Sequence, residues 1–244
     1  MKSRKIFTFF LVAGLFASMS GLVAGCHAIP GIHGDGNVLK ETRTVSSFDG
    51  IEVSGAFQIF LKQGAVEEVV VEADANLLPV ILTVVEGTTL KIDTKKPVHN
   101  VTTMKVYVTV KDLKKIDVSG AVDIETTGRI TVPELSVEAS GASDSKFDIA
   151  VQKLQLGCSG ASKMRFSGIA TNVTMDLSGA SEIYGFDMVT ESYSIDISGA
   201  GNAQINVSKS LRAEISGAGS VKYKGSPSEI DQNISGAGSI KKVQ

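Results

Sequence analysis

Carboxylates and serine hydroxyls recur together along this chain at a regular spacing. The tripeptide Ser-Gly-Ala occurs eight times, and an acidic residue stands two positions before the serine in six of the copies. These acidic residues are Glu52, Asp117, Glu138, Asp176, Asp196 and Glu214. A serine becomes a nucleophile when a general base activates it, whereas carboxylates and hydroxyls together can ligate a divalent cation such as Ca²⁺. The pattern therefore raises two hypotheses, nucleophilic catalysis and cation binding.

The nucleophile hypothesis is disfavoured because the serines have no histidine nearby in sequence. The histidines are His27, His33 and His99, all outside the region of closely spaced repeats. Eight equivalent serines also cannot all be nucleophiles. Cys158 occupies a position where the other copies have Val, Ala, Leu or Ile, so we interpret it as a small buried hydrophobic residue. We therefore predict no catalytic residue and no enzymatic activity.

The spacing of the serines predicts the elements that carry them. The serines are Ser54, Ser119, Ser140, Ser159, Ser178, Ser198, Ser216 and Ser235, and from Ser119 onward they recur about every 19 residues. Apolar residues stand one and three positions before the serines and five positions after them, except for Gln232 and Ser145, with mostly polar residues between. This period of two indicates half-buried strands. Repeated strand–bend–strand units predict an all-β fold, a right-handed parallel β-helix with about 19 residues per coil.

The Ser-Gly-Ala bend fits a structural role at the corner of each coil. Glycine allows a tight bend and close approach of neighbouring coils, we expect alanine to face inward, and serine can bond a backbone amide. Stacking would align the six acidic residues in one outward column. That column is either a solvated face that resists aggregation or a weak face for cations or basic ligands. The glycine- and aspartate-rich calcium repeat is absent, so we predict no metal site and no cofactor.

The chain divides into a leader, a tether and a head. Residues 1–25 read as a lipoprotein signal peptide, because Lys2, Arg4 and Lys5 precede the apolar stretch "IFTFFLVAGLFASM". The stretch "LVAGC" that follows resembles a bacterial lipobox, which implies that Cys26 is lipidated. Glycine-rich residues 26–40 predict a flexible tether. Residues 41–244 form the head, with irregular β-structure in 41–127 and regular coils in 128–244; a two-domain division near residue 127 is the alternative.

Composition narrows the classes of partner. Removing the signal leaves 21 basic and 26 acidic residues, because all three of its charges are basic. This balance argues against nucleic acid. β-Helix enzymes that act on polysaccharides need clustered charged residues at a groove, whereas the mature arginines Arg43, Arg129, Arg165 and Arg212 are scattered. Tyr184, Tyr193 and Tyr223 could form a weak sugar platform, although packing in the core or at a coil edge is their simpler interpretation.

Three segments carry a resemblance to a known family. "FDGIEVSGAFQIFLKQG", then "VEADANLLPVILTVVEGTTLKIDTKK", then the repeated "SGAS" and "SGAG" resemble the putative auto-transporter adhesin head GIN domain family over about residues 46–235. The resemblance implies a right-handed β-helix in a secreted or envelope-anchored bacterial protein. It implies no catalytic residues, because the family has none assigned.

Together these observations predict an outer-membrane lipoprotein of the cell envelope, held to the membrane by lipid on Cys26 and facing either the periplasm or the cell surface. Its expected role is a binding, adhesin-like or structural module for a protein or glycan ligand. The alternatives are a periplasmic protein-interaction component of envelope-stress signalling and a polysaccharide-active enzyme. The last coil, with Lys241 and Lys242 guarding its edge, either stays unpaired or mediates self-association.

Overall fold

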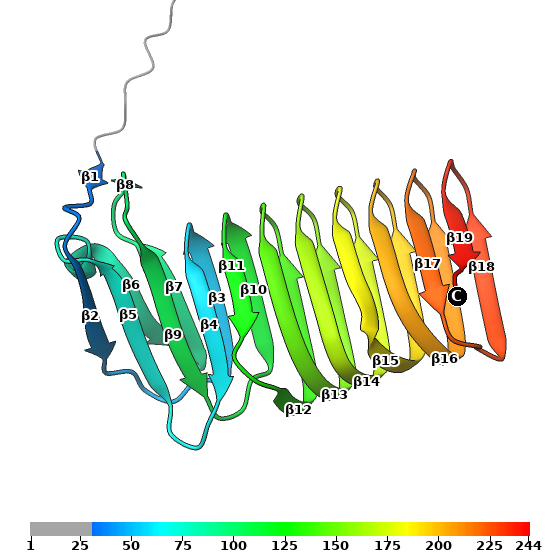
Figure 1. Cartoon of the computed structure of the whole chain (residues 1–244), viewed down its shortest axis with the longest axis horizontal. Coiled ribbons are helices and arrows are strands. Elements are labelled where there is room, and N and C mark those ends of the chain that lie inside the picture. The colour runs from blue at the N-terminus through cyan, green and yellow to red at the C-terminus, as the bar shows by residue number, and fades with distance from the viewer. Residues whose placement is uncertain (1–30) are drawn as a thin grey trace, which may run out of the picture. The chain divides into compact units, whose positions relative to one another are not determined.

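The structure is a computed structural model that describes residues 31–244. The predicted signal peptide and the lipidation residue Cys26 lie outside the described residues. The described part is a stack of β-coils, drawn side by side in Figure 1. This arrangement confirms the predicted all-β parallel solenoid. Between residues 31 and 244, no helix is long and apolar enough to cross a membrane.

The first half of the stack contains short strands and one turn of 3₁₀-helix. Its elements are β1 (Ile32–His33), β2 (Val38–Arg43), β3 (Gly50–Gly55), β4 (Gln58–Gln63), β5 (Glu68–Asp74), η1 (Leu78–Val80), β6 (Ile81–Glu86), β7 (Thr89–Thr94), β8 (Val98–His99) and β9 (Met104–Val110). Within this half, β2 pairs antiparallel with β5, β5 with β9 and β6 with β7. The parallel pairs β3–β7 and β4–β9 then join these strands to the first coil.

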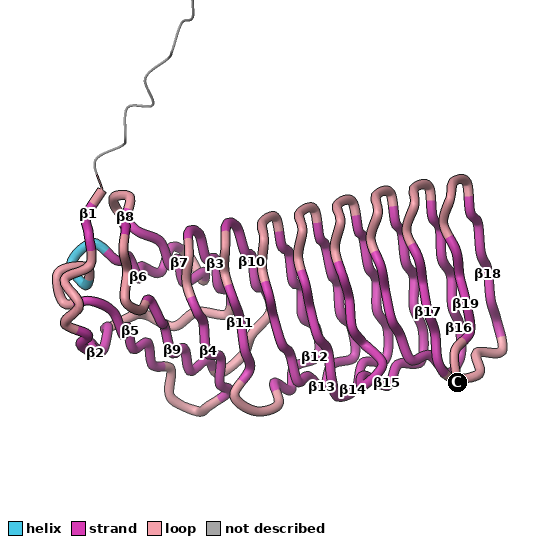
Figure 2. The backbone as a smooth tube through the Cα atoms, turned by 45° about the horizontal axis from the view of Figure 1, so that its top comes forward, coloured by secondary structure: helices cyan, strands magenta, loops and turns pink. Residues whose placement is uncertain are grey.

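The second half contains the regular coils. Its strands are β10 (Lys115–Gly120), β11 (Asp123–Thr126), β12 (Ile130–Ala139), β13 (Asp144–Cys158), β14 (Lys163–Leu177), β15 (Glu182–Ile197), β16 (Asn202–Ile215), β17 (Ser220–Lys224), β18 (Glu229–Ile234) and β19 (Ser239–Lys242). From β10 onward all pairings between these strands are parallel. Each of the longest strands leaves one Ser-Gly-Ala corner, bends, and runs into the next, as the tube in Figure 2 shows.

Each coil therefore has two sides. We call the strands that run into a Ser-Gly-Ala corner the pre-corner side, and those that leave it the post-corner side. The coil β3–β4 lies between the N-terminal strands and the regular stack, because β3 also pairs with β10 and β4 with β11. Seventeen strands from both halves belong to one continuous sheet, which extends across residue 127.

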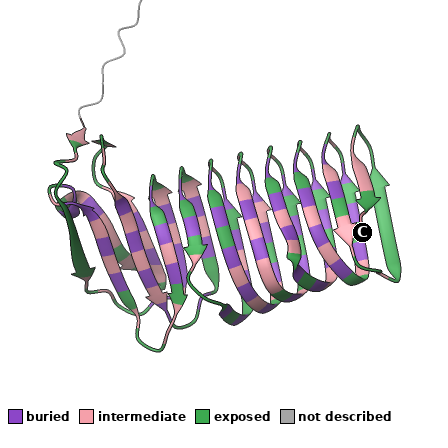
Figure 3. Cartoon of the chain, viewed as in Figure 1, coloured by how far each residue is buried: buried purple, intermediate pink, exposed green. Residues whose placement is uncertain are grey.

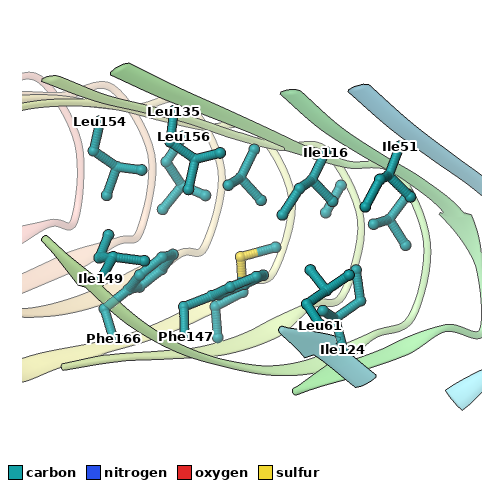
Figure 4. Packing of buried hydrophobic residues seen from close by; sticks show 14 of the residues in the cluster. Ile51, Leu61, Ile116, Ile124, Leu135, Phe147, Ile149, Leu154, Leu156 and Phe166 are labelled. Atoms are coloured by element: carbon teal, nitrogen blue, oxygen red, sulfur yellow. The ribbon is translucent and has the colours of Figure 1, made fainter. Parts of the chain in front are cut away.

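The core is a single apolar cluster between the two sides. Along each strand, buried and exposed residues alternate, visible as bands in Figure 3. Ile51, Ile116 and Leu156 form one row, and Leu61, Ile124 and Phe147 lie opposite them in Figure 4. All of the residues in this cluster are buried. A single coil cannot bury its apolar side chains alone, so the packing of neighbouring coils against one another stabilises the stack.

The corners explain why glycine recurs. A Cβ placed on Gly141 or Gly160 would approach the carbonyl oxygen of the corner glycine in the preceding coil closer than 3.0 Å. The same carbonyls accept hydrogen bonds from the corner alanines of the next coil, for example from Ala161 N to Gly141 O at 3.0 Å. The corner glycines therefore stack in what we call the glycine column, and their lack of a side chain permits hydrogen bonding between coils to continue around the bend.

The expected inward orientation of the corner alanines is wrong. The alanine of every copy is exposed, whereas the residue after it is buried in all copies but the last, as in Phe57, Val122 and Ser181. The reason is the alternation itself, which resumes immediately after the bend and turns the following residue inward. This inward place at the corner is narrow in the later coils, where it holds only Ser or Gly.

The described part of the expected tether is folded. Ile32–His33 pair with Val98–His99 in β8, and residues 38–43 form the edge strand β2. Asp74, fully buried, accepts hydrogen bonds from Gly36 N and Thr102 N, both at 2.8 Å. Glycine content alone suggested flexibility for residues 31–40, but a buried carboxylate on β5 fixes this segment against the first half of the stack.

Candidate ligand-binding faces

The six acidic residues form a column on the pre-corner side, as the repeat predicts. Strand pairing places Asp117 beside both Glu52 and Glu138, Asp176 beside Asp196, and Asp196 beside Glu214. Gly157 interrupts the column between Glu138 and Asp176. We call this arrangement the acidic column. The role of the column in binding a ligand stays a prediction.

The interruption at Gly157 creates a shallow hollow of about 320 Å³. The Glu138 carboxylate lies over Gly157, because a Cβ at position 157 would collide with Glu138 Oε2. Partial burial, together with the charges of Asp117 and Asp176, raises the pKa of Glu138. At the N-terminal end, Lys91 Nζ lies 3.8 Å from Glu52 and Lys115 Nζ 3.2 Å from Asp117, which relieves part of the repulsion. Within residues 31–244, no cluster of acidic, His or Cys side chains is arranged to hold a metal ion.

Four of the eight corner serines make hydrogen bonds through their hydroxyls within the stack. Ser140 Oγ donates to Val118 O at 3.3 Å and Ser178 Oγ to Cys158 O at 3.4 Å, both on the preceding coil. Ser54 Oγ and Ser119 Oγ are 2.9 Å apart. The bonds therefore go to backbone carbonyls or to another serine, whereas we expected a backbone amide. Hydroxyls used in this way connect adjacent coils.

The thiol of Cys158 is placed as the repeat pattern indicates. The residue is 3% exposed, and its Sγ contacts Met164 Sδ at 3.9 Å. Burial raises the pKa of the Cys158 thiol to about 12. Since the thiolate is the reactive form, this cysteine packs the core and is not a nucleophile.

The post-corner side carries a trough that the sequence did not predict. Three adjoining hollows of about 380, 510 and 190 Å³ extend from Gln58 on β4 to Lys222 on β17. The first two share Glu125, Lys146 and Arg165, and the last two share Tyr184 and Gln204. We call these three adjoining hollows together the trough.

Two aromatic rings line the middle of the trough. Tyr184 lies beside Arg165, whose guanidinium carbon is 5.6 Å from the ring centre. Phe186 lies beneath Lys224, whose Nζ is 4.7 Å from the ring centre. Both rings are half-buried, so a ligand can still contact them. At the N-terminal end of the trough a third ring, Phe60, stacks on Tyr107 with 5.1 Å between centroids.

A β-bulge on β15 positions Phe186. Arg165 pairs with Tyr184, but the next pair is Ser167 with Asp187, so Gly185 and Phe186 together oppose the single residue Phe166. A bulge re-aims side chains and often lies beside a functional site. Asn206 Nδ2 from the next coil donates to Phe186 O at 3.4 Å and supports this backbone.

Of the three tyrosines named as a weak sugar platform, one lies in the trough. Tyr193 is buried at 3% exposure, and burial raises its pKa to about 12. Tyr223 packs partly against the core. The spacing of 20 residues between Ser178 and Ser198, after two spacings of 19, signals an extra residue in this coil but does not place the Phe186 side chain.

Stacked coils, an apolar core and two chemically different outward faces define the described part of the chain as a parallel β-solenoid. The sequence profile of the family described as "Putative auto-transporter adhesin, head GIN domain" matches residues 47–227. The chain belongs to this family. No curated protein matches it.

Solved structures of similar fold come from species of Bacteroides and Parabacteroides. A putative adhesin from Bacteroides fragilis shares 24% identity with a TM-score of 0.83, covering 87% of this chain and 100% of its own. A putative lipid binding protein from Parabacteroides distasonis shares 23% identity with a TM-score of 0.72, covering 88% and 100%. A putative adhesin from Parabacteroides merdae shares 21% identity with a TM-score of 0.72, covering 89% and 100%. At these identities the likeness establishes the fold alone, and none of the names is that of an enzyme.

Proposed function

We propose that this protein is an adhesin-like binding module of the cell envelope, anchored by lipid on Cys26. The trough is the observation that carries the binding role. It is open, extends over several coils, and combines aromatic rings with hydrogen-bonding groups, the composition expected of ligand sites. Family membership and the names of the structural neighbours support an adhesin-like role without identifying a ligand.

The anchoring part of the proposal rests on the sequence of the leader. A single lipid chain gives only marginal membrane binding, so stable anchoring needs several chains on the cysteine. Cell fractionation of the wild type and of Cys26→Ser tests this part. We expect the wild type in the membrane fraction and the variant in the soluble fraction. Cys158→Ala is the matched control, because it removes the other cysteine of the chain and should stay in the membrane fraction.

The binding part is tested on intact cells. Brief protease treatment of cells reports whether the head is exposed at the surface, with a periplasmic protein as the control. Purified protein labelled with a fluorophore is then added to cells that lack the gene, and bound fluorescence is measured. Retention that unlabelled protein displaces supports a binding module. Unsaturable or absent retention on all tested bacterial and epithelial cells would contradict it and favour a purely structural role.

A further inference from the structure

The trough has a geometry that suits one class of ligand. It crosses the strands, so a ligand lying in it meets one coil after another. Adjacent coils are about 4.8 Å apart, which is close to the length of one pyranose unit in an extended glycan. Outward residues of successive coils lie in register along it, as Lys146, Arg165, Tyr184 and Gln204 do. A linear polysaccharide therefore matches the repeat of the trough.

The rings provide the stacking surfaces that sugars require. The face of an aromatic ring is electronegative, and the C–H groups on one face of a pyranose are slightly electropositive. Tyr184 and Phe186 supply two such faces on a single coil, the second placed by the bulge. Cations lie over these rings, Lys163 and Arg165 over Tyr184 and Lys224 over Phe186. Both aromatic residues are nevertheless only half-buried, and the cations can donate hydrogen bonds to sugar hydroxyls.

The charge of the trough selects a neutral glycan over an acidic one. Six carboxylates line it, namely Asp123, Glu125, Asp144, Asp148, Glu182 and Asp187. Four cations line it, namely Lys146, Arg165, Lys222 and Lys224.

Several of these charges already have partners, which lowers their capacity for an ionic ligand. Arg165 forms an ion pair with Asp144, and Asp148 with Arg129 at 2.8 Å. Arg129 and Lys163, which pair with Asp148 and Glu182, bring the cations to six and balance the six carboxylates, so the trough offers no net charge to a uronic-acid or sulfated chain. Paired charges can still donate to, and accept from, the hydroxyls of an uncharged sugar.

We propose that the trough binds a neutral linear polysaccharide across successive coils, with Tyr184 and Phe186 stacking on its sugars. This proposal rests on the binding role proposed above and names its ligand class. Binding of the sugars requires no covalent chemistry, so none of the carboxylates acts as a catalytic group here.

The test uses the full-length protein in mild detergent on an array of neutral and acidic linear glycans, followed by calorimetry. The calorimetric probes are cellohexaose, mannohexaose and any neutral array hit, with hexagalacturonate as the acidic probe. We expect binding to a neutral glycan that changes less than about twofold as salt rises from about 0.05 to 0.5 M, since screening acts on charged partners. Tyr184→Ala and Phe186→Ala should each weaken binding about tenfold, as loss of an aromatic anchor does.

Three control variants separate stacking from other effects. Tyr184→Phe keeps the ring and should retain most of the affinity. Ser194→Ala changes an exposed residue on the pre-corner part of β15, outside both candidate faces, and should leave binding unchanged. Thermal unfolding identifies any variant that fails to fold. If Tyr184→Ala fails, Tyr184→Lys replaces it, because lysine keeps an apolar stem without a ring.

Two patterns of glycan binding would overturn the proposal. One is salt-sensitive binding of hexagalacturonate in preference to every neutral glycan, and the other is neutral-glycan binding that survives loss of both rings. Absence of any glycan binding by protein that still binds cells would also reject it, while leaving the adhesin-like function standing. Failure of both assays would reject the proposed function itself.

Discussion

Replacing Gly160 by alanine should destabilise the solenoid more than its small size suggests. Gly160 does not lie in the left-handed region, so alanine fits its backbone conformation. The obstacle is instead the neighbouring coil, because the new Cβ would approach Gly141 O closer than 3.0 Å. Real Cβ atoms do not make such contacts, so the two corners must separate.

The cost follows from what that separation disrupts. Gly141 O accepts a hydrogen bond from Ala161 N at 3.0 Å and another from Ser162 Oγ at 3.3 Å. Each such bond contributes about 1 kcal/mol to stability, and overpacking in a tight site costs about 1–3 kcal/mol. Partial loss of the bonds together with the strain gives a loss of about 2–4 kcal/mol in the free energy of unfolding.

Urea unfolding followed by circular dichroism measures this loss, and amide exchange at Ala161 locates it. Gly87→Ala is the control, because Gly87 has a φ of 62° and no atom within 4 Å of its added Cβ. That variant carries backbone strain alone and should lose about 1 kcal/mol. If Gly160→Ala is no less stable than Gly87→Ala, or if exchange at Ala161 does not change, the explanation of the glycine column by coil contact is wrong.

Three further predictions concern buried or partly buried groups. The Cys158 thiol, whose pKa burial raises to about 12, should not react with Ellman's reagent until urea unfolds the chain. Partial burial raises the pKa of Glu138, so the folded state binds its proton more tightly than the unfolded state does. Glu138→Gln should therefore be more stable at pH 7 by less than about 0.5 kcal/mol, and the gain in melting temperature should vanish as the pH falls below the unfolded value near 4.5. Burial alone would raise the pKa of Asp74, but hydrogen bonds from Thr102 and Gly36 outweigh it and hold the pKa below its ordinary value. Asp74→Asn should lower the melting temperature and speed exchange at Gly36 above pH 4, and the difference should shrink as acid protonates the wild type through its lowered pKa.

The coils could be predicted from the sequence because each coil needs apolar residues at the same inward positions. Ile116, Leu156 and Ile195 each stand three positions before a corner serine. Strand pairing stacks these positions on one another, as the repeat predicts. The acidic column follows from the same reasoning, since residues next to an inward position face outward. Periodicity therefore determines both the core and the alignment of any outward residue that repeats.

Features that depend on departures from the repeat could not be predicted in this way. Phe186 lies in the trough because of a bulge on β15. The spacing between successive corner serines shows that this coil has an extra residue, but it does not show which way the Phe186 side chain points. The tether prediction for residues 31–40 was wrong because glycine content does not reveal a distant buried partner such as Asp74. The orientation of the corner alanines required knowing where the alternation resumes after the bend.

The proposed binding role rests on outward positions, which the repeat leaves free to differ from coil to coil. Corner glycines of the regular coils cannot gain a side chain without colliding with the preceding coil, and a polar side chain at an inward position costs free energy unless it is paired. Outward positions have neither constraint, so the two sides can differ, and they do: one side presents carboxylates in line, the other presents rings beside cations. A ligand that lies across the coils contacts several outward residues at once, so each single contact can be weak. Substitution of one trough residue should weaken binding by a limited factor, whereas insertion of a whole coil between β14 and β15 should separate the two parts of the trough and disrupt recognition while preserving the fold.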